Sequence, residues 1–525
     1  MSLRKLVPFA ALAFLATAAG CAADVGDVDS DEAELQSLSA RSRTLQFDGY
    51  VYVDATASDS SILQAVRSQT QTAFGALRTA QIGVNSRELK DVDTKTFVKT
   101  KVTVIDTSKA NDPGTAMLKV KYTYTDNAVV PKEMSRRTSL SSAVMSGHYG
   151  YQTQRILKEC TANDSEAQEF SSSIWYVFEP GLSSCKTAMT TEQKAIDADK
   201  AKLKDPRTQV SKSEVDRLYL RTTVKLGADK TNKGKSYPEY DRLYTGGVQK
   251  GKVVVGLVNG LIDHGNADET SDSGLDEFAD ELREGFKGHA FKLVKSEPAQ
   301  DFTTVTVNGK SYKYDGIQDW LAWKDGSGFP AGLTSYTDQQ AAIKAVSQKI
   351  IRTWLTFDAP VTVQIGTAAA QSFTLEIQAY FGSSEDETPH KRAIKTSDVF
   401  LYNGHSYIGY GPLDPSNFSA SDFPSSYQII FVDGCVSYNY YEKDYLPLKS
   451  GGTKNLELIT NGLEAPAWHS GYALGKFISR MFDGTQASYL DLLTAANATD
   501  SLRVVDGEID NKYSPSATPI KLSNR

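Results

Sequence analysis

The sequence predicts an α/β protein in which a C-terminal, mostly parallel sheet flanked by helices follows an N-terminal α+β domain. Residues 252–258 form a continuous apolar run, which is typical of a strand buried on both faces of a parallel sheet. Residues 275–286 place their apolar side chains on one face of a helix. Residues 118–124 alternate apolar and polar side chains, as a half-buried strand does.

Composition limits the classes of protein to consider. The chain has 525 residues, 40% of them hydrophobic, which is enough to build buried cores and excludes a disordered chain. At about 100–200 residues per domain, we expect two or three domains. With 57 Lys and Arg against 64 Asp and Glu, the net charge is -7, which argues against a nucleic-acid partner. Four cysteines exclude an iron–sulfur or multi-zinc protein.

The N-terminus has the features of an export signal. Arg4 and Lys5 precede a short apolar run, and the sequence Ala-Ala-Gly-Cys ending at Cys21 resembles a bacterial lipobox. The resemblance implies cleavage after residues 1–20, lipidation of Cys21, and a membrane partner reached through that lipid in the bacterial cell envelope. The alternative is an ordinary signal peptide with a chance cysteine. Residues 21–43 carry many acidic side chains, so we expect an extended tether.

The next two segments are expected to form the N-terminal domain, residues 44–190, and a charged helical connector, residues 191–250. No catalytic motif is evident in residues 44–190, so we expect a structural or substrate-excluding role for that domain. The predicted elements are strands at 44–54, 96–107 and 116–125, helices at 61–80 and 191–204, a strand at 218–226 and a linker at 232–251.

Residues 251–500 are expected to form the C-terminal domain, followed by a tail at 501–525. Its first elements, 252–258, 275–286 and 289–294, predict a βαβ unit. Asn308-Gly309 predicts a hairpin turn. The remaining predicted elements are a helix at 338–355, strands at 361–365, 373–380, 398–402, 427–432 and 456–460, and helices at 471–482 and 487–498.

Two cysteines suit a disulfide, and a third remains unpaired. Cys160 and Cys185 are 25 positions apart, and an oxidising envelope would favour their pairing. Such a cross-link contributes about 3 kcal/mol in the chain-entropy model. Because Cys21 is assigned to lipid, Cys435 is left as a lone thiol.

Two predicted buried strands end in a glycine followed by a reactive residue, as Gly404-His405 and Gly434-Cys435. In open parallel sheets, ligands bind beyond the carboxyl ends of the strands, so neighbouring strands would bring both side chains to one edge. The glycines allow tight turns there. An imidazole beside a thiol can take its proton and activate it as a nucleophile.

These two motifs resemble the caspase-like cysteine peptidases, which include caspases, metacaspases, legumain, clostripain and gingipains. The resemblance spans roughly residues 251–498, and Asp433-Gly434-Cys435 is similar to the Asp-small-Cys motif of metacaspases and clostripain. It implies an endopeptidase acting on a peptide or protein substrate. His405 would be the general acid/base and Cys435 the nucleophile, with the Cys435 N–H in the oxyanion hole.

The residues beside this pair are expected to lie next to the oxyanion and the substrate. These residues are Gly404, Ser406, Gly434 and Asp433. Ser406 departs from the family, which usually has glycine directly after the histidine. Its Cβ hinders close approach of a substrate to the backbone N–H that would be the second oxyanion donor.

Two alternatives to a cysteine peptidase stay open. In a serine hydrolase, Ser406 would act with Asp433 or Asp444 and then His469, but the elbow pattern is one residue too long and no amphipathic helix follows it. In a catalytically inactive relative, the domain would be a binding platform on the cell surface, and the tyrosines of residues 438–441 suit recognition.

An acidic loop follows the first strand of the C-terminal domain. His264, Asp268, Glu269 and Asp272 are candidates for a calcium site or for binding a basic substrate side chain, although the loop lacks the full spacing of a calcium motif. Otherwise we expect no cofactor and no metal, since zinc, phosphate-loop and dinucleotide motifs are missing from the sequence.

Overall fold

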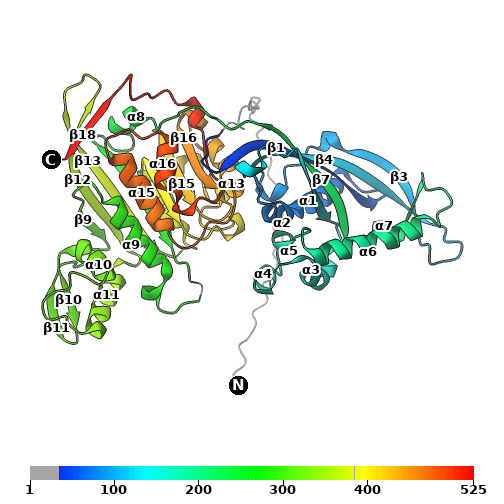
Figure 1. Ribbon diagram of the computed structural model, residues 1–525, viewed down its shortest axis with the longest axis horizontal. Coiled ribbons are helices and arrows are strands. Elements are labelled where there is room, and N and C mark those ends of the chain that lie inside the picture. The colour runs from blue at the N-terminus through cyan, green and yellow to red at the C-terminus, as the bar shows by residue number, and fades with distance from the viewer. Residues whose placement is uncertain (1–34, 163, 264, 384, 525) are drawn as a thin grey trace. The chain divides into compact units, whose positions relative to one another are not determined.

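The computed structural model describes residues 35–524, apart from 163, 264 and 384 (Figure 1). The predicted signal peptide, Cys21, His264 and most of the predicted tether therefore lie outside the described residues. The described chain is mixed α/β, with two large mixed sheets and a separate two-stranded hairpin. The predicted α/β class is correct at this level.

The N-terminal sheet has seven strands in the order β5-β7-β1-β4-β3-β6, with β2 paired to β4. Only β3 and β6 pair in parallel. The strands are β1 (Ala40–Asp54), β2 (Gly83–Val84), β3 (Val98–Ile105), β4 (Thr115–Pro131), β5 (Ser139–Met145), β6 (Gln209–Ser211) and β7 (Tyr219–Asp229).

Helices of this part pack on the core face of the N-terminal sheet, and Glu214 of a short helix reaches Tyr50 and Tyr52 on the opposite face. The alternation of β4 points Val120, Tyr122 and Tyr124 into the core, and the Tyr122 hydroxyl donates to Gln69 Oε1 of α1 at 2.8 Å. The helices are α1 (Asp59–Gln71), α2 (Ala73–Thr79), α3 (Thr153–Cys160), α4 (Asp164–Glu169), α5 (Ile174–Val177), α6 (Ser183–Lys200) and α7 (Lys212–Val215).

The predicted disulfide between Cys160 and Cys185 is confirmed. It joins the last residue of α3 to the first turn of α6, so both cysteines lie in helices. Both side chains are fully buried in the N-terminal core.

Two predicted boundaries around the N-terminal sheet are wrong. The connector at 191–250 contains β6 and β7, and β7 pairs with both β1 and β5 because its alternating apolar side chains need a sheet face to cover. The tether does not extend to residue 43, because Leu35 is buried and Gln36 pairs with Val505 of the C-terminal sheet. Apolar packing of Leu35 and Ala40 against Val504 explains this early start.

The C-terminal sheet has nine strands in the order β17-β16-β15-β14-β8-β13-β12-β18, with β9 also paired to β12. The five from β16 to β13 are parallel, and the pairs at both edges are antiparallel. The strands are β8 (Lys252–Gly260), β9 (Lys292–Glu297), β12 (Trp354–Ile365), β13 (Gln371–Gly382), β14 (Val399–Asn403), β15 (Gln428–Asp433), β16 (Leu456–Asn461), β17 (Arg503–Asp506) and β18 (Ile520–Asn524).

Helices lie on both faces of the C-terminal sheet. α9 (Ser273–Gly285) and α15 (Ser470–Phe482) cover the face that carries Val255 and Leu257, and they lie side by side in Figure 1. Gly471 allows the two helices to approach closely. A Cβ at this position would lie 1.8 Å from the Glu277 carbonyl oxygen. α12 (Glu387–Thr396) packs on the opposite face, where Phe400 and Val432 belong to the other core.

The remaining helices and the hairpin complete this part. The predicted hairpin at Asn308-Gly309 is confirmed as β10 (Thr304–Val307) and β11 (Lys310–Lys313). The helices are α8 (Tyr240–Tyr244), α10 (Gly316–Lys324), α11 (Tyr336–Ile350), α13 (Ser437–Tyr440), α14 (Glu442–Tyr445) and α16 (Tyr489–Ala495).

Three expectations for the C-terminal sheet are wrong. The segment at 289–294 does not complete a βαβ unit, because β9 pairs antiparallel with β12 and its largely solvent-accessible side chains suit an edge strand. The predicted helix at 338–355 ends at Ile350, since β12 begins at Trp354. Residues 501–525 are not a tail, because their apolar residues form β17 and β18 at opposite sides of the sheet.

Candidate active site

The structure brings His405 and Cys435 to the same edge of the C-terminal sheet. β14 and β15 are parallel neighbours, and their last paired residues are Asn403 and Asp433. His405 and Cys435 each stand two residues beyond that pair. The Ser406 hydroxyl donates to the Cys435 carbonyl oxygen at 2.7 Å, so the two strand-end segments lie side by side.

The two glycines before these residues sit where the segments come close together. A Cβ at Gly434 would lie 3.3 Å from the Gly404 carbonyl oxygen and 3.7 Å from the Ser406 Cβ. A Cβ at Gly404 would lie 2.5 Å from the Tyr402 hydroxyl oxygen, which is closer than side chains tolerate. The absence of a side chain at Gly404 therefore leaves room for the Tyr402 ring.

The His405 ring is held by a backbone carbonyl of the loop that follows the neighbouring strand β8. Its Nε2 lies 2.9 Å from the Ile262 carbonyl oxygen, which follows the end of β8. A carbonyl oxygen only accepts hydrogen bonds, so Nε2 is the donor in this contact. The Tyr402 hydroxyl donates to the His405 carbonyl oxygen at 2.7 Å and fixes the backbone.

The Cys435 thiol is partly buried and protonated at neutral pH. Burial is the largest cause that raises its pKa to about 11, and the carboxylates of Glu464 and Asp433 raise it further. The Sγ–H donates to the Ala465 carbonyl oxygen at 3.7 Å, and the cation of Arg78 opposes the rise. Proton removal therefore has to accompany nucleophilic attack rather than precede it.

Side chains from the N-terminal sheet's helices contact the loop that holds this thiol. Arg78 of α2 forms an ion pair with Glu464, the residue before Ala465. The Tyr176 hydroxyl of α5 donates to the same carboxylate at 3.1 Å, and the Arg78 guanidinium lies 4.6 Å from the Tyr176 ring centroid. The electrostatic environment of Cys435 thus includes residues from both parts of the chain.

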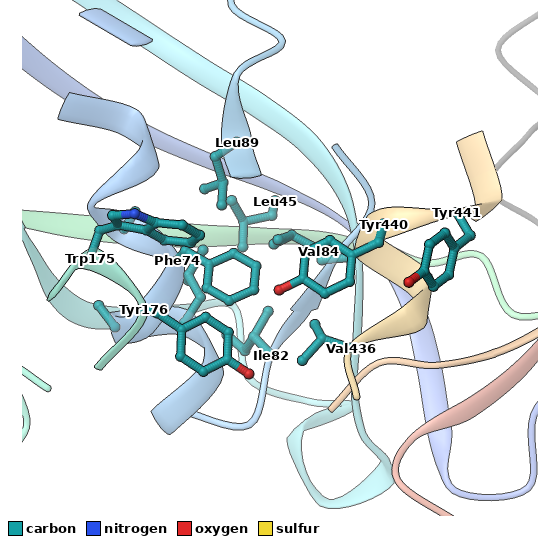
Figure 2. Close-up of a cluster of buried hydrophobic side chains, with 14 of the residues drawn as sticks. Leu45, Phe74, Ile82, Val84, Leu89, Trp175, Tyr176, Val436, Tyr440 and Tyr441 are labelled. Carbon is teal, nitrogen blue, oxygen red and sulfur yellow. The ribbon is translucent and has the colours of Figure 1, made fainter. Parts of the chain in front are cut away.

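A hydrophobic cluster supports this contact (Figure 2). Phe74 of α2 and Tyr176 of α5 stack with ring centroids 5.4 Å apart, and Phe74 also stacks on Tyr440 of α13 at 6.4 Å. Val436, directly after Cys435, belongs to the same core. The turn that presents the thiol is therefore packed against buried side chains of the N-terminal part.

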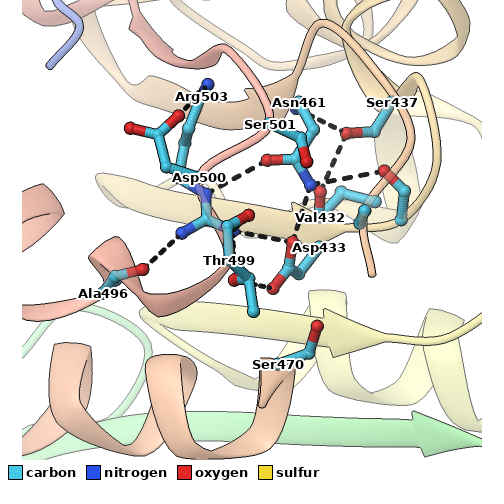
Figure 3. Close-up of polar contacts among 12 residues, drawn as sticks. Val432, Asp433, Ser437, Asn461, Ser470, Ala496, Thr499, Asp500, Ser501 and Arg503 are labelled. Atoms are coloured by element: carbon cyan, nitrogen blue, oxygen red, sulfur yellow. Dashed lines mark hydrogen bonds and ion pairs between the residues drawn. The ribbon is translucent and has the colours of Figure 1, made fainter. Parts of the chain in front are cut away.

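Asp433 is committed to a buried polar network and does not face a substrate (Figure 3). Its Oδ1 accepts from Arg503 Nη2 at 2.8 Å and from Asn461 Nδ2 at 2.6 Å, and its Oδ2 accepts from the Thr499 hydroxyl at 3.3 Å. The side chains of Arg503 and Asp433 are only 1% and 0% exposed. The expected substrate-adjacent role of Asp433 is therefore wrong, and this carboxylate anchors the end of β15 instead.

Sequence reasoning missed Arg503 and Glu464 as neighbours of the site. Arg503 lies in the segment expected to be a tail, and Glu464 follows the strand after Cys435. The one local signal for Arg503 is a lone cation within the apolar sequence Leu-Arg-Val-Val, since a buried charge needs a partner. Glu464 has no comparable signal in its surroundings.

The acidic loop after β8 has structural contacts instead of an open cluster of carboxylates. Asp272 accepts from the backbone N–H groups of Ile262 and Asp263 at 3.0 Å, and it also caps α9. Asp268 pairs with Lys344, and Glu269 pairs with Arg352. Asp268 and Glu269 are thus each paired with a cation, and within the described ranges no group of three or more His, Cys, Asp or Glu is placed to hold a metal ion.

Ser406 lacks the setting that a serine nucleophile needs. Its side chain is only 4% exposed, and its hydroxyl donates to a backbone carbonyl rather than to an imidazole. A short 3₁₀ turn, Tyr407–Gly409, follows it instead of an amphipathic helix. Asp433 is bound to Arg503, which removes it as the acid of such a triad.

Comparison with known proteins gives no match to a family model, to a curated protein or to a solved structure. Over the part of the chain that the structure describes, no helix has the length and apolar character needed to cross a membrane.

Proposed function

We propose that the C-terminal part is a caspase-like cysteine peptidase domain that hydrolyses peptide bonds in a peptide or protein substrate. The observation that carries the proposal is the register of β14 and β15, which sets His405 and Cys435 at matched positions beyond one sheet edge. The hydrogen bond between Ser406 and the Cys435 carbonyl supports it, because it ties the two segments together. The hydrogen bond from His405 Nε2 to the Ile262 carbonyl oxygen supports it further, because it holds the imidazole ring in one orientation.

The proposed reaction has two halves. In the first, the Cys435 thiol gives its proton to the imidazole of His405 as Sγ attacks the scissile carbonyl carbon, and the Cys435 N–H stabilises the oxyanion. The C–N bond breaks, the imidazolium protonates the leaving amine, and a thioester remains. In the second, His405 takes a proton from water as its oxygen attacks the thioester, and the departing thiolate recovers that proton.

A catalytically inactive binding platform is the second candidate, and one observation favours it. The Cys435 thiol donates to the Ala465 carbonyl and has a raised pKa, which are properties of a buried structural cysteine. In that case the same domain binds its partner without cleaving it.

A comparison of peptide hydrolysis by the full chain and its variants tests the proposal. A diverse peptide pool is incubated with each protein, and new termini are identified by mass spectrometry. Cys435→Ala and His405→Ala should each lower cleavage by about a thousandfold or more. His148→Ala, which changes an exposed histidine of the N-terminal part, should leave cleavage unchanged. Equal cleavage by Cys435→Ala would end the proposal.

We also propose that the protein is lipid-anchored in the bacterial cell envelope. The lipobox-like sequence that ends at Cys21 supports this location. Cells that express the chain are grown with a labelled fatty acid, and the protein should carry the label. A Cys21→Ser variant should lose it, and a labelled variant would contradict the proposal.

A further inference from the structure

The N-terminal sheet carries a groove of about 920 Å³ on the face opposite the core residues Val120 and Tyr124. Strands β1, β3, β4, β5 and β7 all contribute to it, and they are consecutive in the strand order of the sheet. Four of them, β1, β3, β4 and β7, are labelled in Figure 1. Four cations, Lys119, Lys121, Arg221 and Lys225, line it, with one carboxylate, Asp48. We call this surface the basic groove.

Strand register explains why these cations gather on one face. Side chains two residues apart on a strand point to the same side, which groups Lys119 with Lys121 and Arg221 with Lys225. Lys121 pairs with Tyr50 of β1, and Lys225 pairs with Gln46 of the same strand, two residues from Asp48 and four from Tyr50. The three strands β4, β1 and β7 therefore present their polar side chains together.

The charge of the basic groove is not balanced within the protein. The whole chain has a net charge of -7, whereas the groove has four positive side chains against one negative. Lys225 lies 3.8 Å from Asp48, but Lys119 and Lys121 form no ion pair with any carboxylate of the described residues. Burial, and after it the nearby cations Lys121, Arg217 and Lys200, lower the pKa of Lys119, while Glu214 opposes this.

The shape and chemistry of the groove favour one class of anion. It is open and crosses several strands, so it suits an extended chain with repeated charges, and threonine and serine side chains in its lining offer hydrogen bonds. The bases of single-stranded nucleic acids usually stack on exposed aromatic rings. In the groove, Lys119 Nζ lies 3.8 Å from the Tyr50 ring centroid, and Tyr122 is only 2% exposed.

We propose that the basic groove binds an extended polypeptide segment rich in aspartate and glutamate. The carboxylates of the segment would pair with Lys119, Lys121 and Lys225, and its backbone would meet the hydroxyl groups of the lining. This binding is independent of the proposed peptidase activity, because the groove shares no residue with the candidate active site.

The test measures fluorescence anisotropy of a labelled peptide of ten glutamates with the purified full chain at low ionic strength. A peptide of ten glutamines serves as the uncharged control. The variant Lys119→Gln/Lys121→Gln/Lys225→Gln should bind at least about tenfold more weakly. The matched variant Lys292→Gln/Lys313→Gln/Lys521→Gln removes three exposed lysines elsewhere and should bind as the unchanged chain does.

Further measurements decide the remaining outcomes. Binding should weaken steeply with added salt, because solvent-exposed charges are screened. Circular dichroism and melting temperature establish that both triple variants are folded. The proposal is overturned if the glutamate peptide binds no better than the glutamine peptide, or if both triple variants bind it equally. It is also overturned if heparin or a single-stranded oligonucleotide binds the same lysines more tightly than the glutamate peptide does.

Discussion

The thiol of Cys435 should react slowly with iodoacetamide in the resting protein. Its pKa lies at about 11 against an ordinary value of 9.0. A pKa that is higher by about two leaves about 100-fold less thiolate at neutral pH. Each thiolate is about eightfold more nucleophilic, because nucleophilicity rises with pKa at a Brønsted slope of about 0.4–0.5. The net rate should therefore be about tenfold below that of an unperturbed thiol, before any effect of steric cover.

Rates of alkylation are measured by mass spectrometry between pH 7 and pH 10, with a short cysteine peptide as the reference. Glu464→Gln should accelerate the reaction, because it removes a carboxylate that raises the pKa and leaves the Arg78 cation near the thiol. Glu133→Gln, at an exposed glutamate, should have no effect. A rate at pH 7.5 equal to or above that of the reference peptide, with a plateau near neutral pH, would show that the Cys435 pKa is not raised.

Three further predictions concern stability, measured by urea denaturation. Arg503→Met should cost about 3–5 kcal/mol, because it leaves the Asp433 charge buried without its partner. Burial raises the Glu281 pKa from 4.5 to about 8, so the contribution of this carboxyl group to the free energy of unfolding is intact below pH 4.5. That contribution declines by at most about 5 kcal/mol as the pH rises to 8. Glu281→Gln should therefore flatten the loss of stability with rising pH. Replacing Cys160 and Cys185 together by serine should cost about 3 kcal/mol.

Each stability prediction has a control and a contradicting result. Adding Asp433→Asn to Arg503→Met should recover part of the loss, and no recovery would argue against an unpaired charge as its cause. A Glu281→Gln protein with the same pH profile as the unchanged chain would place the titration elsewhere. Equal stability of the unchanged chain with and without reductant would deny a contribution from the disulfide.

The strands of the parallel sheet could be predicted because burial on both faces leaves a continuous apolar run. Residues 252–258, 398–402 and 427–432 show this pattern, and the structure has β8, β14 and β15 there. Pairing was harder to predict, because an apolar run does not state its neighbour. The segment at 289–294 was therefore expected beside β8, whereas the long strand β13 takes that place.

The positions of His405 and Cys435 followed from local sequence, but their surroundings did not. Each residue follows a glycine at the end of an apolar strand, and that pattern is visible along the chain. The groups that set the thiol's environment come from distant segments: Arg78 and Glu464 are 386 positions apart, and Asp433 and Arg503 are 70 apart. No periodicity links such pairs, so only the folded chain reveals them.

Detection of a covalent intermediate is the most direct test that Cys435 is the nucleophile in peptide hydrolysis. The full chain is mixed with a peptide pool, quenched in acid, digested and examined by mass spectrometry for an acyl group on a cysteine. A hydroxylamine-sensitive acyl adduct should form on Cys435, and the His405→Ala variant should form it far more slowly. Peptide hydrolysis with no adduct on Cys435, and with undiminished turnover in Cys435→Ala, would show that Cys435 is not the nucleophile.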